Sequence, residues 1–401
     1  MGLFPCSCPL PCNKTRECQN NSTHLQSDFS TSSSLSSQPS LPSVPSLSSP
    51  SQNRHHDHQC LVTLRGHSSY VSSLAVSGKF IYSGSSDGKI LAWPREPPEN
   101  IAGDNTVAVG NGAVKAMVVF RYKLITAHQD HKIRVWKIEE RDPPQKYKCV
   151  ATLPTANDRF TKIFSGKNYV EVRRHKKCTW VHHLDTVSSL ALSKDGSLLY
   201  SASWDRTFKI WRTSDFRCLE SKEKAHEDAI NAVVVSCDGF VYTGSADKKI
   251  KVWKKQPREK RHNLVATLEK HVSAVNALAI SEDDTVLYSG ACDRSILVWE
   301  RNRIDDEHMV LAGALRGHSK AILCLAVVSD LVFSGSADKA IRVWRRGTDK
   351  GYSCLAALDG HSKPVKCLAV SLGSDSDVSC MVYSGSLDLS VKVWRIRIPL
   401  L

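Results

Sequence analysis

Long apolar runs are missing from this chain of 401 residues. No stretch approaches the roughly 18 residues of a membrane-spanning helix, and the start, MGLFPCSCPLPC, is too interrupted by proline and cysteine for a secretory signal. The repeated part of the chain also lacks a glycine-rich phosphate loop, a unique nucleophile and a metal-binding cluster. The sequence therefore predicts a protein that is not an enzyme and that holds neither cofactor nor metal.

Acidic residues are in deficit. The chain has 54 Lys and Arg against 40 Asp and Glu, which gives a formal net charge of +14. Residues 1–60 contribute nothing to this excess, because Lys14, Arg16 and Arg54 are balanced by three acidic residues. The positive charge lies on the rest of the chain, where it favours acidic proteins, phosphorylated segments or nucleic acid as partners.

Cysteine is not scarce, but its placement argues against disulfides. Several of the 14 cysteines recur in one repeat position, as in CLVTL, CVATL and CLAAL, and equivalent positions of different repeats are too far apart to pair. The sequence therefore predicts a reducing compartment, in the cytoplasm and the nucleus.

Seven tryptophans end seven copies of one pattern, in which a short apolar run such as KIRVW follows an Asp. Successive tryptophans are 42 to 50 residues apart, except for a gap of 75 between Trp136 and Trp211. In six copies a His and a Ser or Thr precede the Asp. The six tetrads are His67, Ser83, Asp87, Trp93; His183, Ser201, Asp205, Trp211; His226, Thr243, Asp247, Trp253; His271, Ser289, Asp293, Trp299; His318, Ser334, Asp338, Trp344; and His361, Ser384, Asp388, Trp394.

Ser, His and Asp together suggest a hydrolase, but a catalytic nucleophile occurs once per chain beside an oxyanion site. Six equivalent sets favour buried hydrogen-bond networks that join the strands of each repeat. The second repeat has Thr126, Asp130 and Trp136, with Gly110 where a His is expected. We therefore expect this repeat to be the least rigid.

Repeats of about 40–45 residues built from short β runs are typical of a β-propeller. Over about residues 59–396 the chain resembles the WD40 family. The resemblance implies an all-β fold, a seven-bladed WD40 β-propeller over residues 59–398, which acts through protein contacts. None of the seven tryptophans is followed by Asp. In the family a terminal Trp-Asp-x-Arg box often marks substrate receptors of ubiquitin ligases, so that role is only an alternative here.

Ring closure needs a strand from outside the last repeat, because the C-terminus supplies no outer strand for the seventh blade. The run CLVTL (Cys60 to Leu64) is the expected strand. The residues before it, 1–58, form a Ser- and Pro-rich arm with few aromatic or charged residues. Such a composition cannot build a core, so the arm is predicted to be disordered.

The long gap between tryptophans corresponds to an insert at about residues 155–181, which leads into the third blade. The insert, the divergent second blade and the Ser-rich arm resemble the plant JINGUBANG-like WD40 proteins. That resemblance implies a regulatory role in a plant, linked to pollen germination and hormone signalling.

Partner binding is expected on the rim that carries the turns before each Asp. Tyr70, Trp204 and Leu387 are large side chains at rim positions that are small in most repeats. The insert is expected on the same rim as Trp204, unless Trp204 packs beneath it. It adds four basic residues to the predicted partner-binding set: Arg173, Arg174, Lys176 and Lys177.

Basic residues interleaved with aromatics bind acidic peptides or nucleic acid, and a broad repeat surface favours proteins. A monomer that docks other proteins is the main prediction. A nucleic-acid-binding module is one alternative. A membrane scaffold is another, which requires lipidation at Gly2 and the nearby cysteines. The run Lys254 to His262 is a candidate nuclear import signal on the opposite rim.

Overall fold

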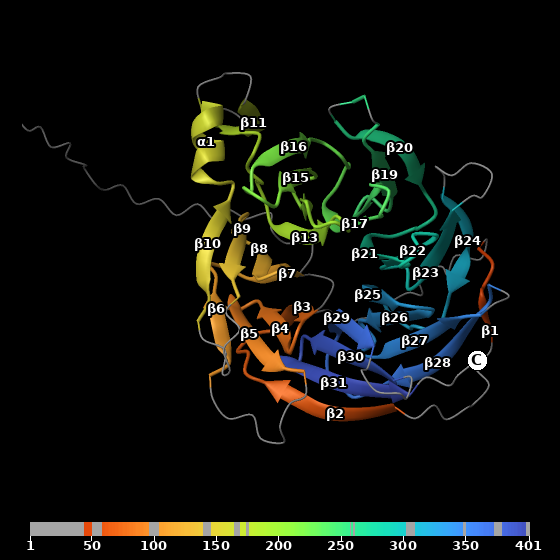
Figure 1. Cartoon of the computed structure of the whole chain (residues 1–401). Coiled ribbons are helices and arrows are strands. Elements are labelled where there is room, and N and C mark those ends of the chain that lie inside the picture. The colour runs from red at the N-terminus through yellow and green to blue at the C-terminus, as the bar shows by residue number, and fades with distance from the viewer. Residues whose placement is uncertain are drawn as a thin grey trace, which may run out of the picture. The chain divides into compact units, whose positions relative to one another are not determined.

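The computed structural model describes residues 44–49, 58–95, 104–138, 146–163, 169–173, 176–256, 258–259, 261–301, 309–347, 350–372 and 379–397. Pro39–Leu401 forms one compact unit. Within it, four-stranded antiparallel sheets follow one another around a ring (Figure 1). Val- and Ile-rich runs form the strands, and Asp- and Gly-containing turns separate them, so the fold is a seven-bladed β-propeller.

Each blade runs from an inner strand to an outer strand. The first three blades are β3 (Val71–Ser77), β4 (Phe80–Ser85), β5 (Lys89–Pro94) and β6 (Thr106–Val109); β7 (Val114–Phe120), β8 (Lys123–His128), β9 (Ile133–Lys137) and β10 (Lys148–Leu153); and β13 (Val187–Leu192), β14 (Leu198–Ser203), β15 (Phe208–Arg212) and β16 (Cys218–Lys222).

The next three blades follow the same order. They are β17 (Ile230–Val235), β18 (Val241–Ser245), β19 (Ile250–Lys254) and β20 (Asn263–Leu268); β21 (Val275–Ile280), β22 (Val286–Ala291), β23 (Ile296–Arg301) and β24 (Met309–Leu315); and β25 (Ile322–Val328), β26 (Leu331–Ser336), β27 (Ile341–Arg346) and β28 (Tyr352–Leu358).

The seventh blade joins the two ends of the repeat region. It consists of β29 (Val365–Leu372), β30 (Ser379–Ser386), β31 (Ser390–Arg397) and β2 (His58–Arg65). β2 pairs antiparallel with β31, so that Cys60 lies opposite Trp394 and Leu64 opposite Val391. The predicted closure by CLVTL is confirmed, and β31 gains a partner instead of an exposed edge.

The insert consists of α1 (Ala156–Ile163), β11 (Tyr169–Arg173) and β12 (Lys176–Thr179), and β11 pairs with β12. It leaves β10 at Leu153, beside the start of β9. Asp158 Oδ2 then accepts a hydrogen bond from the Cys218 backbone N–H at 3.1 Å, at the opposite end of the third blade. The helix therefore runs along the outer wall of the second and third blades (Figure 1). The insert therefore emerges at the same end of the propeller as Trp204, as expected, and its helix then continues away from that end.

Part of the Ser-rich arm packs on the propeller. Residues 44–49 lie against the fifth and sixth blades, and β1 (Ser48–Ser49) pairs parallel with β28. The prediction of a disordered arm is wrong for these residues, although residues 1–43 and 50–57 lie outside the described residues. A short Ser- and Pro-rich segment cannot build a core of its own, but Val44 and Leu47 pack into cores that the blades supply.

Candidate functional site

Six tetrads join the strands of six blades through hydrogen bonds. In each, His Nε2 lies 2.7–2.8 Å from the hydroxyl of the Ser or Thr. The Trp Nε1–H donates to that same hydroxyl at 2.8–3.0 Å. In five of the tetrads His Nδ1 lies 2.8–3.3 Å from the Asp carboxylate. There the chain of donors runs from Trp to Ser or Thr, then to His and finally to Asp.

The hydroxyl oxygens of the tetrads have no access to a substrate. Ser83, Ser201, Thr243, Ser289, Ser334 and Ser384 are all fully buried. A hydrolytic nucleophile must meet its substrate, so this arrangement does not fit a catalytic triad. The networks instead satisfy polar groups that would otherwise be costly to bury.

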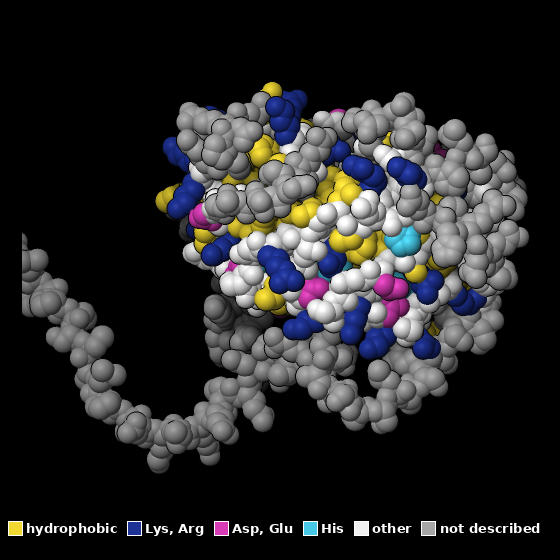
Figure 2. Space-filling view, turned by 90° about the horizontal axis from the view of Figure 1, so that it is seen from below, with side chains coloured by type: hydrophobic (Ala, Val, Ile, Leu, Met, Phe, Trp, Pro, Cys, Tyr) yellow, Lys and Arg dark blue, Asp and Glu magenta, His cyan; other side chains and the backbone are white. Residues whose placement is uncertain are grey.

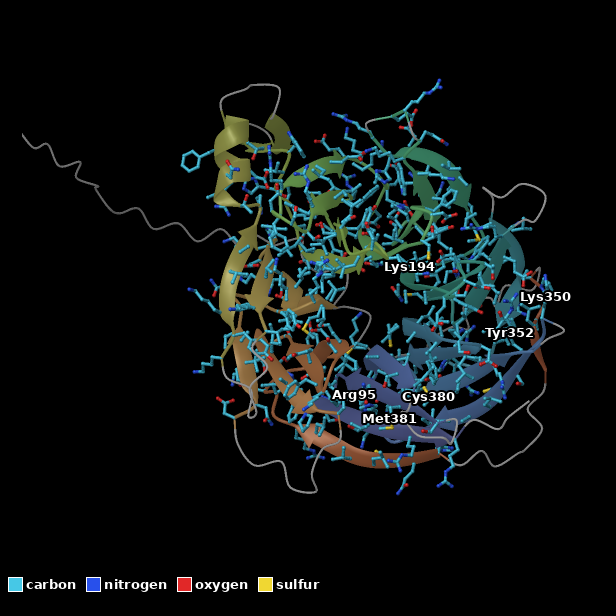
Figure 3. The ribbon with its side chains drawn as sticks, in the orientation of Figure 1. Arg95, Lys194, Lys350, Tyr352, Cys380 and Met381 are labelled. Carbon is cyan, nitrogen blue, oxygen red and sulfur yellow. The ribbon has the colours of Figure 1, made fainter. Side chains whose placement is uncertain are left out.

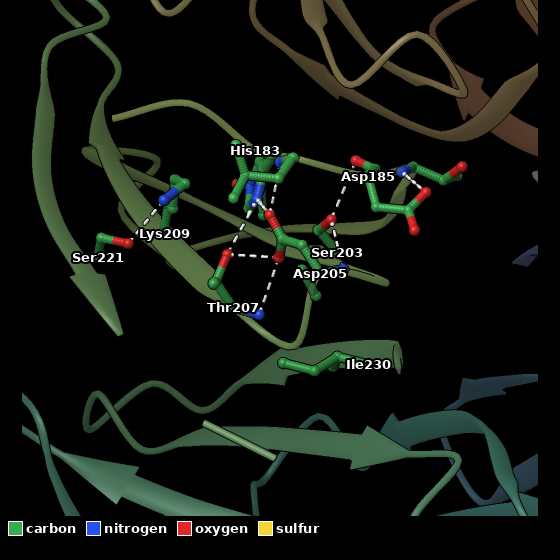
Figure 4. Close-up of polar contacts among 12 residues, drawn as sticks. His183, Asp185, Ser203, Asp205, Thr207, Lys209, Ser221 and Ile230 are labelled. Carbon is green, nitrogen blue, oxygen red and sulfur yellow. Dashed lines mark hydrogen bonds and ion pairs between the residues drawn. The ribbon is translucent and has the colours of Figure 1, made fainter. Parts of the chain in front are cut away.

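Each Asp also fixes two loops at one end of the propeller, which we call the Asp-turn rim. In the third blade, Asp205 Oδ2 accepts the backbone N–H of Leu184 at 2.7 Å, and Oδ1 accepts the backbone N–H of Thr207 at 2.9 Å (Figure 4). Burial raises the pKa of Asp205, but the His183 imidazole and the neighbouring polar groups outweigh it, so the pKa lies below its usual range. A carboxylate bonded to both loops therefore fixes the shape of this rim in six blades.

The first blade has the loosest of these networks. His67 Nδ1 lies 3.4 Å from Asp87 Oδ2, against 2.8 Å for His226 and Asp247. His67 Nδ1 has no hydrogen-bond partner. Burial lowers the pKa of His67 despite the nearby carboxylate. The His in this blade is therefore held mainly through Ser83.

The second blade contains an imidazole after all. His128, at the end of β8, places its Nε2 2.7 Å from Thr126 Oγ1, to which Trp136 Nε1 donates at 2.9 Å. Gly110 leaves the space for this ring, because a Cβ there would lie 2.3 Å from His128 Cε1. We expected this blade to be the least rigid because a His was missing. That reason is wrong, since the ring enters from the second strand.

The charged groups of the second blade are rearranged as well. Asp130, which would face the tetrad His in another blade, forms a bidentate ion pair with Arg134. Burial and the Arg134 charge lower the pKa of His128 to about 4. The second blade therefore keeps a neutral imidazole in its core and a paired Asp on the rim.

Tyr70 and Trp204 are brought together on the Asp-turn rim by Lys115, which sequence reasoning missed. The Lys115 Nζ lies 5.7 Å from the centre of the Tyr70 ring and 5.5 Å from that of Trp204. It also donates to the Tyr70 hydroxyl at 3.3 Å. Both rings are half-buried, so three consecutive blades contribute one side chain each to a compact aromatic and cationic cluster.

Lys115 takes this place because of an exchange at the second position of the inner strands. In four other blades an amide or hydroxyl at this position donates to a backbone carbonyl of the next blade, as Asn231 does to Val275 at 3.0 Å and Asn276 to Ile322 at 2.8 Å. In the second blade the same position is Lys115, and its side chain turns to Tyr70. The sixth and seventh blades have Leu323 and Lys366 there.

The cluster changes the acidity of Tyr70. Burial raises the pKa of its hydroxyl, but the charge of Lys115, hydrogen bonds to Ser86 and Lys115, and the charge of Lys366 outweigh this effect. The net pKa lies below the usual value of 10. Positive potential is therefore concentrated at this point of the rim, where an anionic group of a partner would be favoured.

The other predicted partner-binding residues are not all part of this cluster. Leu387 lies half-buried on the rim of the seventh blade, where its N–H donates to Pro364 at 3.0 Å. Arg173 lies in β11, and Lys176 and Lys177 lie in β12. Arg174 is outside the described residues. Partner binding by these residues stays a prediction.

A ring of basic residues on the same rim was also missed. The residue after the Asp has a left-handed backbone in every blade, and it is Gly88 in the first. Residues other than glycine rarely adopt this backbone conformation. Of the other six residues at this position, five are basic and one is a leucine. These residues are His131, Arg206, Lys248, Arg294, Lys339 and Leu389. The Asp-turn pattern contained this signal, because the position follows directly after each Asp.

The sequence model of the WD domain, G-beta repeat, matches residues 58–94, 175–212, 217–254, 262–300, 309–345 and 352–395. The chain belongs to the WD40 family. The long interval between the first two matches contains the second blade and most of the insert. WD40 propellers act as interaction scaffolds and are typically non-catalytic.

Similar proteins come from fungi and animals. Elongator complex protein 2 of Saccharomyces cerevisiae is 32% identical over 129 residues, which is 30% of this chain and 16% of that protein. Ribosome biogenesis protein YTM1 of Kluyveromyces lactis is 28% identical over 54% of this chain and 41% of its own length. Small ribosomal subunit protein RACK1 of Drosophila melanogaster is 31% identical over 25% of this chain and 30% of its own length. The chain thus spans less than half of each.

Among the described residues, no helix is long and apolar enough to cross a membrane. No three His, Cys, Asp or Glu side chains in those ranges lie together as metal ligands would. The import signal predicted at Lys254 to His262 is bounded by packed residues. Lys254 Nζ lies 4.0 Å from the centre of the Phe240 ring, and His262 is buried against Glu220.

Proposed function

We propose that this propeller is a non-enzymatic scaffold that docks acidic or phosphorylated segments of other proteins at the cluster of Tyr70, Lys115 and Trp204. The single observation that carries this is the placement of the Lys115 ammonium between two half-buried rings. Aromatic side chains bury large areas at interfaces, and a cation next to them supplies selectivity for anions.

Two further features support this choice of face. The six Asp–loop networks hold the rim loops in one shape, which lowers the entropy cost of binding. The basic residues that follow five of the seven Asp residues add positive charge to the same rim, which speeds the approach of acidic partners. Lys and Arg side chains also stand out against few Asp and Glu on the wall seen in Figure 2, so binding outside the cluster needs a control.

The test is a quantitative pull-down from nuclease-treated extract of the protein's own cells. Wild type is compared with Lys115→Met, which keeps the apolar stem but removes the charge, and with Tyr70→Ala, Trp204→Ala. The matched control is Lys132→Met, which removes the same charge from an exposed rim position of the same blade. Partners should be lost from both cluster variants and kept by the control.

Each partner is then reduced to a peptide, whose affinity is measured against the same variants. We expect Lys115→Met to weaken an acidic or phosphorylated peptide by about tenfold, and a neutral analogue to bind poorly to every variant. An unchanged partner list for the cluster variants, all melting cooperatively, would place docking elsewhere. Loss of the partners on nuclease treatment would favour a nucleic-acid-binding module.

We further propose that the chain works as a monomer in the cytoplasm and nucleus, with the insert as a second contact. A plant regulatory role, linked to germination or hormone response, stays a proposal based on the family resemblance alone. The relatives found are fungal and animal proteins with varied names. The docking cluster is therefore the part of the proposal to test first.

A further inference from the structure

The chain contributes an extended segment of its own to a groove on the outer wall, between the fifth and sixth blades. Residues 44–49 run parallel to the outer strands β24 and β28. Leu47 N–H donates to Ala314 O at 2.9 Å, and Ala314 N–H donates to Pro45 O at 2.9 Å. On the other side, Tyr352 N–H donates to Leu47 O at 3.1 Å. Backbone groups of two separate edges are thus satisfied by one short peptide.

The groove is shaped for this close approach. Gly313 lies in the middle of β24, and a Cβ there would come within 2.5 Å of Leu47 Cγ and 2.9 Å of Pro45 O. Glycine within a strand often marks such an approach of another backbone. In the other blades whose outer strand has this register, the position opposite the residue before the Trp carries a side chain. These residues are Val62, Ala151, Glu220, Ala266 and Ala356.

Two side chains anchor the segment. Val44 is 4% exposed and packs into the core of the fourth and fifth blades, with Met309 and Ala314. Leu47 packs against the core that contains Tyr352, which lies on β28 at the outer side of the ring (Figure 3). Arg316 Nη2 donates to the Val44 carbonyl at 2.7 Å, at the start of the segment. The groove therefore selects an extended peptide with apolar residues three positions apart.

We infer that this groove is a peptide-binding site for uncharged segments of the pattern Val-Pro-x-Leu in partner proteins, and that residues 44–49 are its resident ligand. The eight residues 50–57 join the segment to β2 of the neighbouring seventh blade. Such a short tether gives the resident ligand an effective concentration of about millimolar. A partner segment enters only where it competes with that concentration or where the resident segment is removed.

The site is separate from the rim cluster, and it can be tested without it. The probe is a fluorescent peptide with the sequence of residues 42–50, titrated by anisotropy into two full-length proteins. One is wild type, and the other carries Val44→Ser and Leu47→Ser, which remove both anchors of the resident segment. The peptide should bind the double variant. Its affinity for wild type should be lower by about tenfold or more, because the resident segment fills the groove.

Two controls define the site. A probe with the same two Ser substitutions should not bind either protein. Adding Gly313→Val to the double variant should abolish binding of the unchanged probe, because the new side chain takes the space of Leu47. A protein with this change that melts cooperatively and still binds would overturn the inference, and so would equal binding of the probe to wild type and double variant. If Gly313→Val prevents folding, the probe with the two Ser substitutions tests the inference instead.

Sedimentation of the wild-type protein shows whether the segment in each groove comes from the same chain or from a second copy. A monomer at all concentrations is expected if each chain fills its own groove. A dimer that Leu47→Ser dissociates would mean that the segment is exchanged between copies, which would overturn the resident role in one chain.

Discussion

The imidazole of His128 fills the space that Gly110 leaves open, and it does so from the second strand of the blade. The ring bonds to Thr126 Oγ1 at 2.7 Å, as the His of the loop does in six other blades. The position of His128 corresponds to a Ser in most of them, as at Ser85 and Ser336. A His and a small residue have in effect exchanged places.

This exchange predicts a compensating pair of substitutions. His128→Ser should destabilise the fold by about 1–3 kcal/mol, because it leaves a cavity and removes a partner of Thr126. Gly110→His should also destabilise it, since both rings need one space. The double variant restores the arrangement of the other blades, so it should be more stable than the sum of the single effects by about 1 kcal/mol or more. Urea unfolding of the four proteins measures this coupling. Additive effects would show that the two positions are independent.

Acidification should weaken the fold through the same ring. The pKa of His128 is about 4 in the folded protein against an ordinary value of 6.5, so the unfolded state binds the proton first as pH falls. Its stabilising effect is present above pH 6.5 and is lost down to about pH 4. The loss amounts to about 3 kcal/mol. His128→Gln should flatten the pH dependence of unfolding in this window, whereas His131→Gln, at an exposed position, should not. Equal slopes for both variants would contradict the assignment to His128.

The repeat pattern predicts most of this fold but only part of the site. Asp and Trp at fixed spacing identify each blade because turn and strand chemistry are local. The partner of Tyr70 and Trp204 could not be predicted, because Lys115 reaches them through a contact between blades that are far apart in sequence. His128 was missed for a related reason. The repeat spacing predicts a His in one loop. The packing of the blade requires only that an imidazole fills a particular space, whether it comes from that loop or from the second strand.

The arm shows the same limit. Its composition predicts that it has no core of its own, but composition does not reveal a groove elsewhere in the chain. Gly313 was the available signal, since it interrupts an outer strand where the corresponding residues bear side chains. A glycine in one repeat, at a position where the other repeats carry a side chain, points to close contact with another segment.

Truncations separate the arm from the strand that closes the ring. Deleting residues 1–43 should leave stability unchanged. Deleting residues 1–57 removes the burial of Val44 and Leu47 and should cost about 1–3 kcal/mol, because the apolar gain is partly offset by the entropy of ordering the segment. Deleting residues 1–66 removes β2 and exposes the edge of β31, so cooperative unfolding should be lost. Thermal melts by circular dichroism distinguish the three. A cooperative melt of the shortest fragment would refute the closure by β2.

The ammonium of Lys115 should control the acidity of Tyr70. Its charge and hydrogen bond lower the pKa of the hydroxyl, so Lys115→Met should raise that pKa. The titration is followed by NMR of ring-labelled tyrosine, with the Tyr70 signal assigned from Tyr70→Phe. Lys132→Met serves as the control of equal charge. An unchanged Tyr70 titration in Lys115→Met would show that the contact is not formed in solution.

The two distances within the tetrads predict unequal costs for one substitution made in two blades. Asp338 Oδ2 lies 2.9 Å from His318 Nδ1, whereas Asp87 Oδ2 lies 3.4 Å from His67 Nδ1. Both carboxylates also accept backbone N–H groups from the two rim loops. Asp87 accepts the exposed Ser68 hydroxyl in addition, at 3.2 Å, so the two carboxylates differ in this exposed bond and in the buried bond to the His. Asp338→Ala should therefore cost about 1–3 kcal/mol, and Asp87→Ala should cost less, because the first blade has less of this hydrogen bond to lose. Urea unfolding at neutral pH provides both values under one condition. An equal or larger cost for Asp87→Ala would mean that the loops, and not the imidazole, determine what the carboxylate contributes.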